Sequence, residues 1–129
     1  MIRTGELSAR ELVEKSLRRI DALEPQVNAF THVAHDAALA AADEIGAADP
    51  RPFAGVPIAV KDNRPVAGMP ITMCSDLFGD TIAHHDAFLV RRLREPSWIT
   101  AANATAPAAM IGLRHGSAAL WSGRRSSPW

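Results

Sequence analysis

A short apolar run, Val56-Pro57-Ile58-Ala59-Val60, constrains the fold more than any other part of the sequence. The run has the length of a strand and contains β-branched residues, which favour strands. Pro57 stands near its start or at an edge, where a missing N–H does not interrupt a sheet. An unbroken apolar run of this length is typical of a buried strand, so we predict one here.

Helical patterns lie on both sides of this strand. Ser8 and Glu11 form a capping-box pattern that predicts the start of an amphipathic helix, and Pro25 is expected to close it. A second helix is expected from about His35 to Ile45 and a third over Asp86 to Glu95, with mostly loop between strand and third helix. The order helix, helix, strand, loops, helix predicts an α/β fold.

The composition of the chain changes near residue 95. Residues 1–95 carry 11 basic and all 14 acidic side chains, whereas residues 96–129 carry 3 basic and no acidic ones, together with all three tryptophans. The second part shows neither helical periodicity nor strand alternation. We therefore divide the chain into 1–95 and an irregular tail, 96–129. The tail is either a natural basic tail or, the interpretation we favour, a stretch translated out of its original frame.

Charge and cysteine usage narrow the classes of partner. The 14 basic side chains balance the 14 acidic ones and no long like-charge block occurs, so neither nucleic acid nor a membrane surface is expected as a partner. Cys74 is the single cysteine, which excludes a disulfide framework and favours a reducing compartment. No run of about 18 apolar residues occurs. We expect a cytoplasmic protein with a small neutral ligand.

Lys61 follows the predicted strand directly, with Asp62 and Asn63 after it. Open α/β sheets bind their ligands at the carboxyl ends of strands, so Lys61 is a candidate general base. A general base must be neutral, and the lysine pKa of about 10.4 would have to be lowered by an apolar environment. The alternative is a strand-end lysine whose ammonium group reaches solvent, and residue type and spacing alone favour it. Asp62 and Asn63 are expected to end the strand and bond to local backbone, with a role in orienting Lys61 as the alternative.

Three blocks around Lys61 resemble the amidase-signature family. The first runs from Gly55 through Pro57 to Lys61-Asp62, in the order G-x-P-x-x-x-K-D. The second contains Thr72 and Ser75, with Cys74 where the family usually has glycine. The third is Asp86-Ala87-Phe88-Leu89-Val90-Arg91-Arg92-Leu93-Arg94. The resemblance covers about residues 2–95 and stops abruptly there.

This resemblance implies a large mixed sheet wrapped by helices, of which the chain supplies the first helices and an early strand. It also implies cleavage of a small amide by a Ser-cisSer-Lys triad that needs no cofactor or metal, with Lys61 as the base. The family's two serines belong to a glycine- and serine-rich stretch that does not occur in this sequence. Ser117, Ser122, Ser126 and Ser127 lie in the wrong context, so the chain alone is expected to be inactive.

Several alternatives stay open. An ammonia-releasing amidotransferase subunit of the same family shares these blocks, and a small helical interaction module could reuse them. His84-His85-Asp86 and the pair His32 and His35 offer metal-ligand atoms, but solvated surface roles are expected for them. The predicted strand is expected to lack partners on both edges, which self-association would supply.

Overall fold

Helices and strands alternate along the chain, which confirms the predicted α/β class. The computed structural model describes residues 2, 4–47, 49–73, 75–78, 81–95 and 99–104. The elements are, in chain order, α1 (Ala9–Val27), β1 (Phe30–Val33), α2 (His35–Asp43), β2 (Pro57–Lys61), the short 3-10 helix η1 (Asp76–Phe78), α3 (Phe88–Arg94) and β3 (Ile99–Ala104). Among the described residues, no helix is both long enough and apolar enough to cross a membrane.

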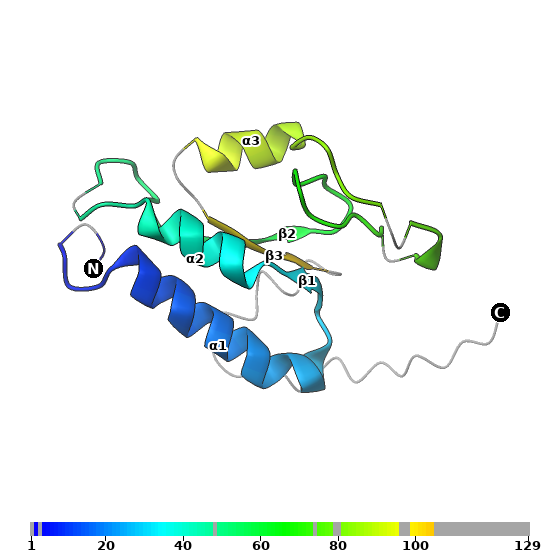
Figure 1. Ribbon diagram of the computed structural model, residues 1–129, viewed down its shortest axis with the longest axis horizontal. Helices are drawn as coiled ribbons and strands as arrows, with labels where there is room; N and C mark the ends of the chain where they lie inside the picture. The colour runs from blue at the N-terminus through cyan, green and yellow to red at the C-terminus, as the bar shows by residue number, and fades with distance from the viewer. Residues whose placement is uncertain are drawn as a thin grey trace.

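The three strands of the described residues form one mixed sheet in the order β1-β3-β2. The middle strand, β3, runs antiparallel to β1 and parallel to β2. Parallel neighbours need a crossover connection, and the chain between β2 and β3 carries α3. Figure 1 shows α3 on one side of the strands and α1 and α2 on the other.

The start of α1 forms as the sequence predicts. The Ser8 hydroxyl accepts a hydrogen bond from the Glu11 backbone N–H at 3.1 Å, and the Glu11 carboxylate accepts one from the Ser8 backbone N–H at 2.8 Å. The expectation that Pro25 closes the helix is wrong, because α1 continues to Val27 and ends at Asn28, whose φ is 47°. A proline in the last turn removes one backbone donor without ending the helix. The helix ends instead at Asn28, whose backbone is left-handed.

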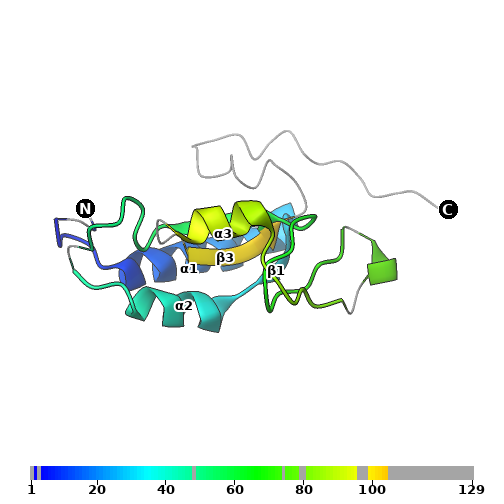
Figure 2. The same cartoon turned by 90° about the horizontal axis from the view of Figure 1, so that it is seen from above.

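In the part of the chain that the structure describes, two apolar clusters hold the layers together. The first joins α1 and α2 to β3, and its buried members are Ala9, Val13, Leu17, Ala38, Ala42, Ile99 and Ala101. Alanine supplies most of the α2 and β3 contribution, so α2 can lie close against the sheet. The second cluster joins α3 to β2 and the following loop through Val60, Val66, Met69 and Val90. Figure 2, seen from above, shows α3 overlying the sheet with its axis in roughly the direction of β3.

Other expectations about the elements need correction. The second helix ends at Asp43, before Ile45, and the strand β1 was not predicted. The strand β3 lies inside the segment expected to be irregular, 96–129. Its residues Ile99 to Ala102 are only 1–7% exposed, so burial on both faces removes the alternation that would have marked a strand. Consequently β2 has β3 as a partner on one edge, and the expectation that both its edges are unpaired is wrong.

Gly55, the first residue of the G-x-P block, fixes the approach of α1 to the turn before β2. Its φ is +78°, and a Cβ built on it would lie 2.4 Å from the Ala9 Cβ and 3.1 Å from the Ala9 Cα. Both the backbone conformation and the close approach of a helix therefore require glycine.

We predict that Gly55→Ala destabilises the fold by at least about 2 kcal/mol, since a left-handed alanine is strained and its methyl group would displace α1. Thermal unfolding measures the effect. Gly46→Ala is the matched control, because its φ is not positive and a Cβ there meets nothing within 4 Å. Equal melting temperatures for the two variants would contradict this account of the contact.

Candidate active site

Lys61 is the last residue of β2, as the sequence predicts, and it pairs in register with Ala104, the last residue of β3. Because β2 and β3 are parallel, their carboxyl ends share one edge of the sheet, which is where α/β proteins bind ligands. The Lys61 side chain is exposed. It forms no hydrogen bond or ion pair with any residue that the structure describes.

Asp62, the next residue, has the opposite environment, since its side chain is 0% exposed. One carboxylate oxygen accepts a hydrogen bond from the Thr72 backbone N–H at 2.9 Å, and the other accepts one from the Thr72 hydroxyl. The expectation that Asp62 bonds to local backbone is therefore wrong, because its partner lies 10 residues further along the chain. Asn63 is exposed in the turn that follows, in which the Arg64 N–H donates to the Lys61 carbonyl at 2.9 Å.

The loop after Lys61 is held by further hydrogen bonds. Its middle pairs with residues 81–83: the Gly68 N–H donates to the Ala83 carbonyl at 2.8 Å, and the Ala83 N–H donates to the Met69 carbonyl at 3.0 Å. Asp86 accepts a hydrogen bond from the Ala67 N–H at 2.7 Å and pairs with the Arg94 guanidinium at 2.9 Å. Asp86, the aspartate of the D-A-x-x-V block, therefore links this loop to α3.

The described serines are engaged elsewhere. Ser8 caps α1, the Ser16 hydroxyl donates to the Leu12 carbonyl at 2.8 Å, and the Ser75 hydroxyl accepts from the Leu77 N–H at 3.3 Å. Within the described residues no serine is hydrogen-bonded to Lys61. Ser117, Ser122, Ser126, Ser127 and Cys74 lie outside the described residues.

The histidine pairs do not assemble a ligand set in the part of the chain that the structure describes. His32 lies in β1 whereas His35 begins α2, so the two do not share a helix, and the His35 Nε2 lies 2.9 Å from an Asp21 carboxylate oxygen. No group of three or more His, Cys, Asp or Glu side chains comes together among the described residues.

The pKa shifts that the structure produces concern surface carboxylates and their partners. Hydrogen bonds from the Ser8 backbone N–H and hydroxyl lower the pKa of Glu11. Hydrogen bonds from the Arg51 side chain and backbone lower the pKa of Asp49 to about 2. Both carboxylates order the chain locally, at the start of α1 and in the loop before β2, and neither is bonded to Lys61.

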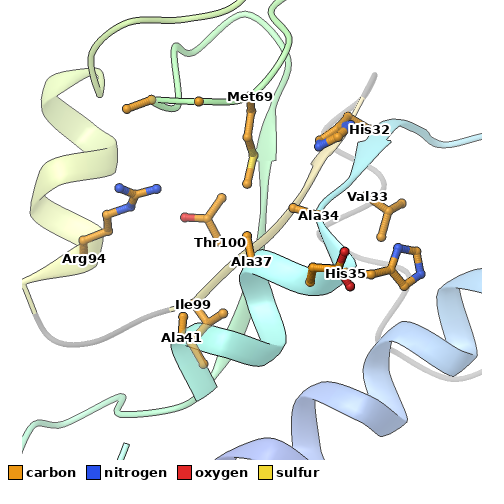
Figure 3. A pocket seen from close by; sticks show the side chains of 13 residues that line it. His32, Val33, Ala34, His35, Ala37, Ala41, Met69, Arg94, Ile99 and Thr100 are labelled. Carbon is orange, nitrogen blue, oxygen red and sulfur yellow. The ribbon is translucent and has the colours of Figure 1, made fainter. Parts of the chain in front are cut away.

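A hollow of about 530 Å³ lies between α2, α3 and β3, and Figure 3 shows the side chains around it. Arg94 extends into it from α3, and Thr100 rises from β3 with a buried hydroxyl that has no hydrogen-bond partner among the described residues. Lys61 is not among the residues that line this hollow.

Comparison with known proteins identifies one family and several similar sequences. A family model described as Amidase matches residues 11–129. A glutamyl-tRNA(Gln) amidotransferase subunit from Rhodopirellula baltica is 32% identical over 131 residues, covering 98% of this chain and 26% of that protein. The corresponding protein of Nitratidesulfovibrio vulgaris is 41% identical over 93 residues, covering 70% of this chain and 19% of that protein.

Solved structures have a fold similar to that of most of this chain. The peptide amidase of Stenotrophomonas maltophilia matches with a TM-score of 0.72 and 30% identity, covering 79% of this chain and 22% of that one. A 6-aminohexanoate cyclic dimer hydrolase complexed with substrate matches with a TM-score of 0.72 and 27% identity, covering 80% of this chain and 21% of that one.

These matches set the extent of the resemblance. The chain spans about a quarter or less of the length of the relatives it matches. The family match continues past residue 95, where we expected it to end, as far as residue 129. With its signature blocks in order around β2, the loop after it and α3, the chain belongs to the amidase family.

Proposed function

We propose that this chain is the lysine-bearing N-terminal part of an enzyme that cleaves the C–N bond of a carboxamide, with Lys61 as its general base. The observation that carries the proposal is the place of Lys61: it stands at the lysine of the family's G-x-P-x-x-x-K-D block and at the carboxyl end of β2. The amine is exposed and has no bonding partner among the described residues. No carboxylate of the described residues forms an ion pair with it, and it could act as a base only where the rest of a complete fold covers it.

The reaction that follows needs two serines in addition to Lys61. The neutral amine takes a proton through a bridging serine from the nucleophilic serine, whose oxygen attacks the amide carbonyl. The C–N bond then breaks, the leaving amine takes up the proton, and water hydrolyses the acyl-enzyme to a carboxylic acid and free serine. In this scheme the remaining part of the fold supplies the serines and covers the Lys61 side chain, because a base works best when water is excluded from its surroundings.

An amidotransferase-type subunit is the second candidate, and the names of the sequence relatives favour it. Such a protein would use the same lysine to release ammonia from an amide for transfer rather than into solution. The described residues include the lysine that both candidates would use. In either candidate, parts of the fold other than β2 and α3 would select the amide substrate. A direct comparison of ammonia release from glutamine and from simple carboxamides, made on a complete protein that contains this chain, separates the two.

The purified 129-residue chain should not hydrolyse acetamide or benzamide above the buffer background, because no described serine stands at Lys61. Ammonia release over hours at high protein concentration is the measurement, with Lys61→Ala as the control. Saturable turnover that disappears in Lys61→Ala would contradict the prediction and require a serine within these 129 residues.

Two substitutions in a chimera test whether Lys61 is the base. Residues 9–95 of this chain replace the matching segment of the Stenotrophomonas maltophilia peptide amidase, which restores a complete fold. Lys61→Ala should lower kcat by about a hundred- to ten-thousand-fold. Lys61→Arg should be as damaging, because arginine, with a pKa above about 12, cannot supply a neutral base.

Lys15 gives the matched control, since it is the only other lysine in the sequence and lies exposed on α1. The variants Lys15→Ala and Lys15→Arg should keep the kcat of the unaltered chimera. A Lys61→Arg chimera with near-normal kcat would show that the side chain contributes charge or packing and would remove it as the base.

A further inference from the structure

We propose that Asp62 is a positioning residue for Lys61, which it fixes by holding Thr72 through its buried carboxylate. The inference rests on the proposed role of Lys61 as the base. It assigns a function to a residue whose own side chain faces away from the exposed edge where the amine lies.

The environment of Asp62 is unusual for a residue that merely ends a strand. Such residues bond to backbone two positions on and stay in contact with water. The Asp62 side chain is 0% exposed and binds Thr72 through both carboxylate oxygens. A carboxylate without water is costly unless hydrogen bonds replace its hydration, so these two bonds fix where the chain must pass after Lys61.

The consequence for Lys61 is that its backbone is held from both sides. Before it, β2 pairs with β3 up to the position of Ala104. After it, Asp62 closes the loop onto Thr72, and the turn from Lys61 to Arg64 adds one backbone bond. Lys61 ends β2 and is exposed, whereas Asp62 begins the turn after it and is buried, so anchoring the Asp62 carboxylate to Thr72 fixes the backbone directly after Lys61. A base has to be held within a fraction of an ångström of its working geometry, and Asp62 provides that restraint.

The carboxylate could instead act on Lys61 through its negative charge, and substitution by asparagine separates the two roles. Asp62→Asn removes the charge but can still accept from the Thr72 N–H and donate to the Thr72 hydroxyl. Asp62→Ala removes both the charge and the hydrogen bonds. Positioning therefore requires asparagine to preserve the behaviour of Lys61, and a charge effect requires it to resemble alanine.

The first experiment uses the 129-residue chain labelled with ¹⁵N-lysine, which has two backbone lysine signals, Lys15 and Lys61. In Asp62→Ala the order parameter of the Lys61 amide should fall from about 0.85, the value of rigid backbone, to below about 0.6, the value of flexible backbone. The Lys15 amide in α1 should not change. Asp62→Asn should keep Lys61 rigid. A folded Asp62→Ala chain with a rigid Lys61 amide, or an Asp62→Asn chain with a flexible one, would overturn the proposal.

Two further variants guard against a general loss of structure. Thr72→Val removes the hydroxyl bond to Asp62 and keeps the bond from the backbone N–H, so the Lys61 amide should become partly flexible. Thr72→Ser keeps both bonds, so the Lys61 amide should stay rigid. This pair tests the proposal even if Asp62→Ala fails to fold. Asp86→Ala loses anchors of the same loop at Ala67 and Arg94. It should lower the melting temperature while leaving the Lys61 amide rigid. If Asp86→Ala loosens Lys61 as much as Asp62→Ala does, or if Thr72→Val leaves Lys61 unchanged, the restraint does not come from Asp62.

The second experiment measures kcat and KM in the chimera with the peptide amidase. Asp62→Ala should lower kcat per folded enzyme on the order of a hundredfold with little change in KM, as expected for a displaced catalytic group, and Asp62→Asn should recover most of it. An unchanged kcat in Asp62→Ala would overturn the positioning role even if Lys61→Arg is inactive. An active Lys61→Arg chimera would instead overturn the proposed base, whatever Asp62 does.

Discussion

The pairing of β3 with both other strands is the interaction on which the rest of the structure depends. It is the middle strand of the sheet, its residues Ile99 and Ala101 belong to the core beneath α1 and α2, and its carboxyl end lies beside Lys61. Without β3, the helices α1 and α2 would lose the strand against which they pack, and β2 would have no hydrogen-bonded neighbour among the described residues. Interactions between residues far apart in sequence therefore create the edge that carries the candidate site.

Local signals in the sequence predicted the elements that local interactions determine. The capping box at Ser8 and Glu11 and the apolar run that became β2 depend on neighbouring residues, and both were predicted correctly. The end of α1 was misplaced because a proline is a weaker stop in the last turn of a helix than within it. The strand β3 was missed because four buried residues in succession, two of them alanine, show no alternation of apolar and polar side chains.

In the candidate site, too, the features set by neighbouring residues could be predicted and those set by distant contacts could not. The place of Lys61 followed from the end of an apolar strand, and its role rests on a family block. An orienting role for Asp62 was an open alternative, but its pairing with Thr72 could not be predicted, since that contact forms only when the loop folds back. Gly55 was identified only as the glycine of the G-x-P block. The reason that glycine is required there, the close approach of Ala9, depends on the position of α1 and cannot be seen in the sequence. The boundary at residue 95 stays a prediction about domain organisation, although β3 and the family match both lie beyond it.

The exposed amine of Lys61 is compatible with its proposed role only if the complete fold covers it. The chain spans about a quarter or less of the relatives it matches, so most of the surface that would enclose the lysine belongs to the rest of such a protein. The protonation state of Lys61 in a complete fold tests this account most directly. In the peptide amidase chimera at pH 7, with lysine labelled at ¹³Cε and the Lys61 signal assigned by its loss in Lys61→Arg, the account predicts the chemical shift of a neutral amine. The shift of a charged ammonium, unchanged from that of the isolated 129-residue chain, would contradict it.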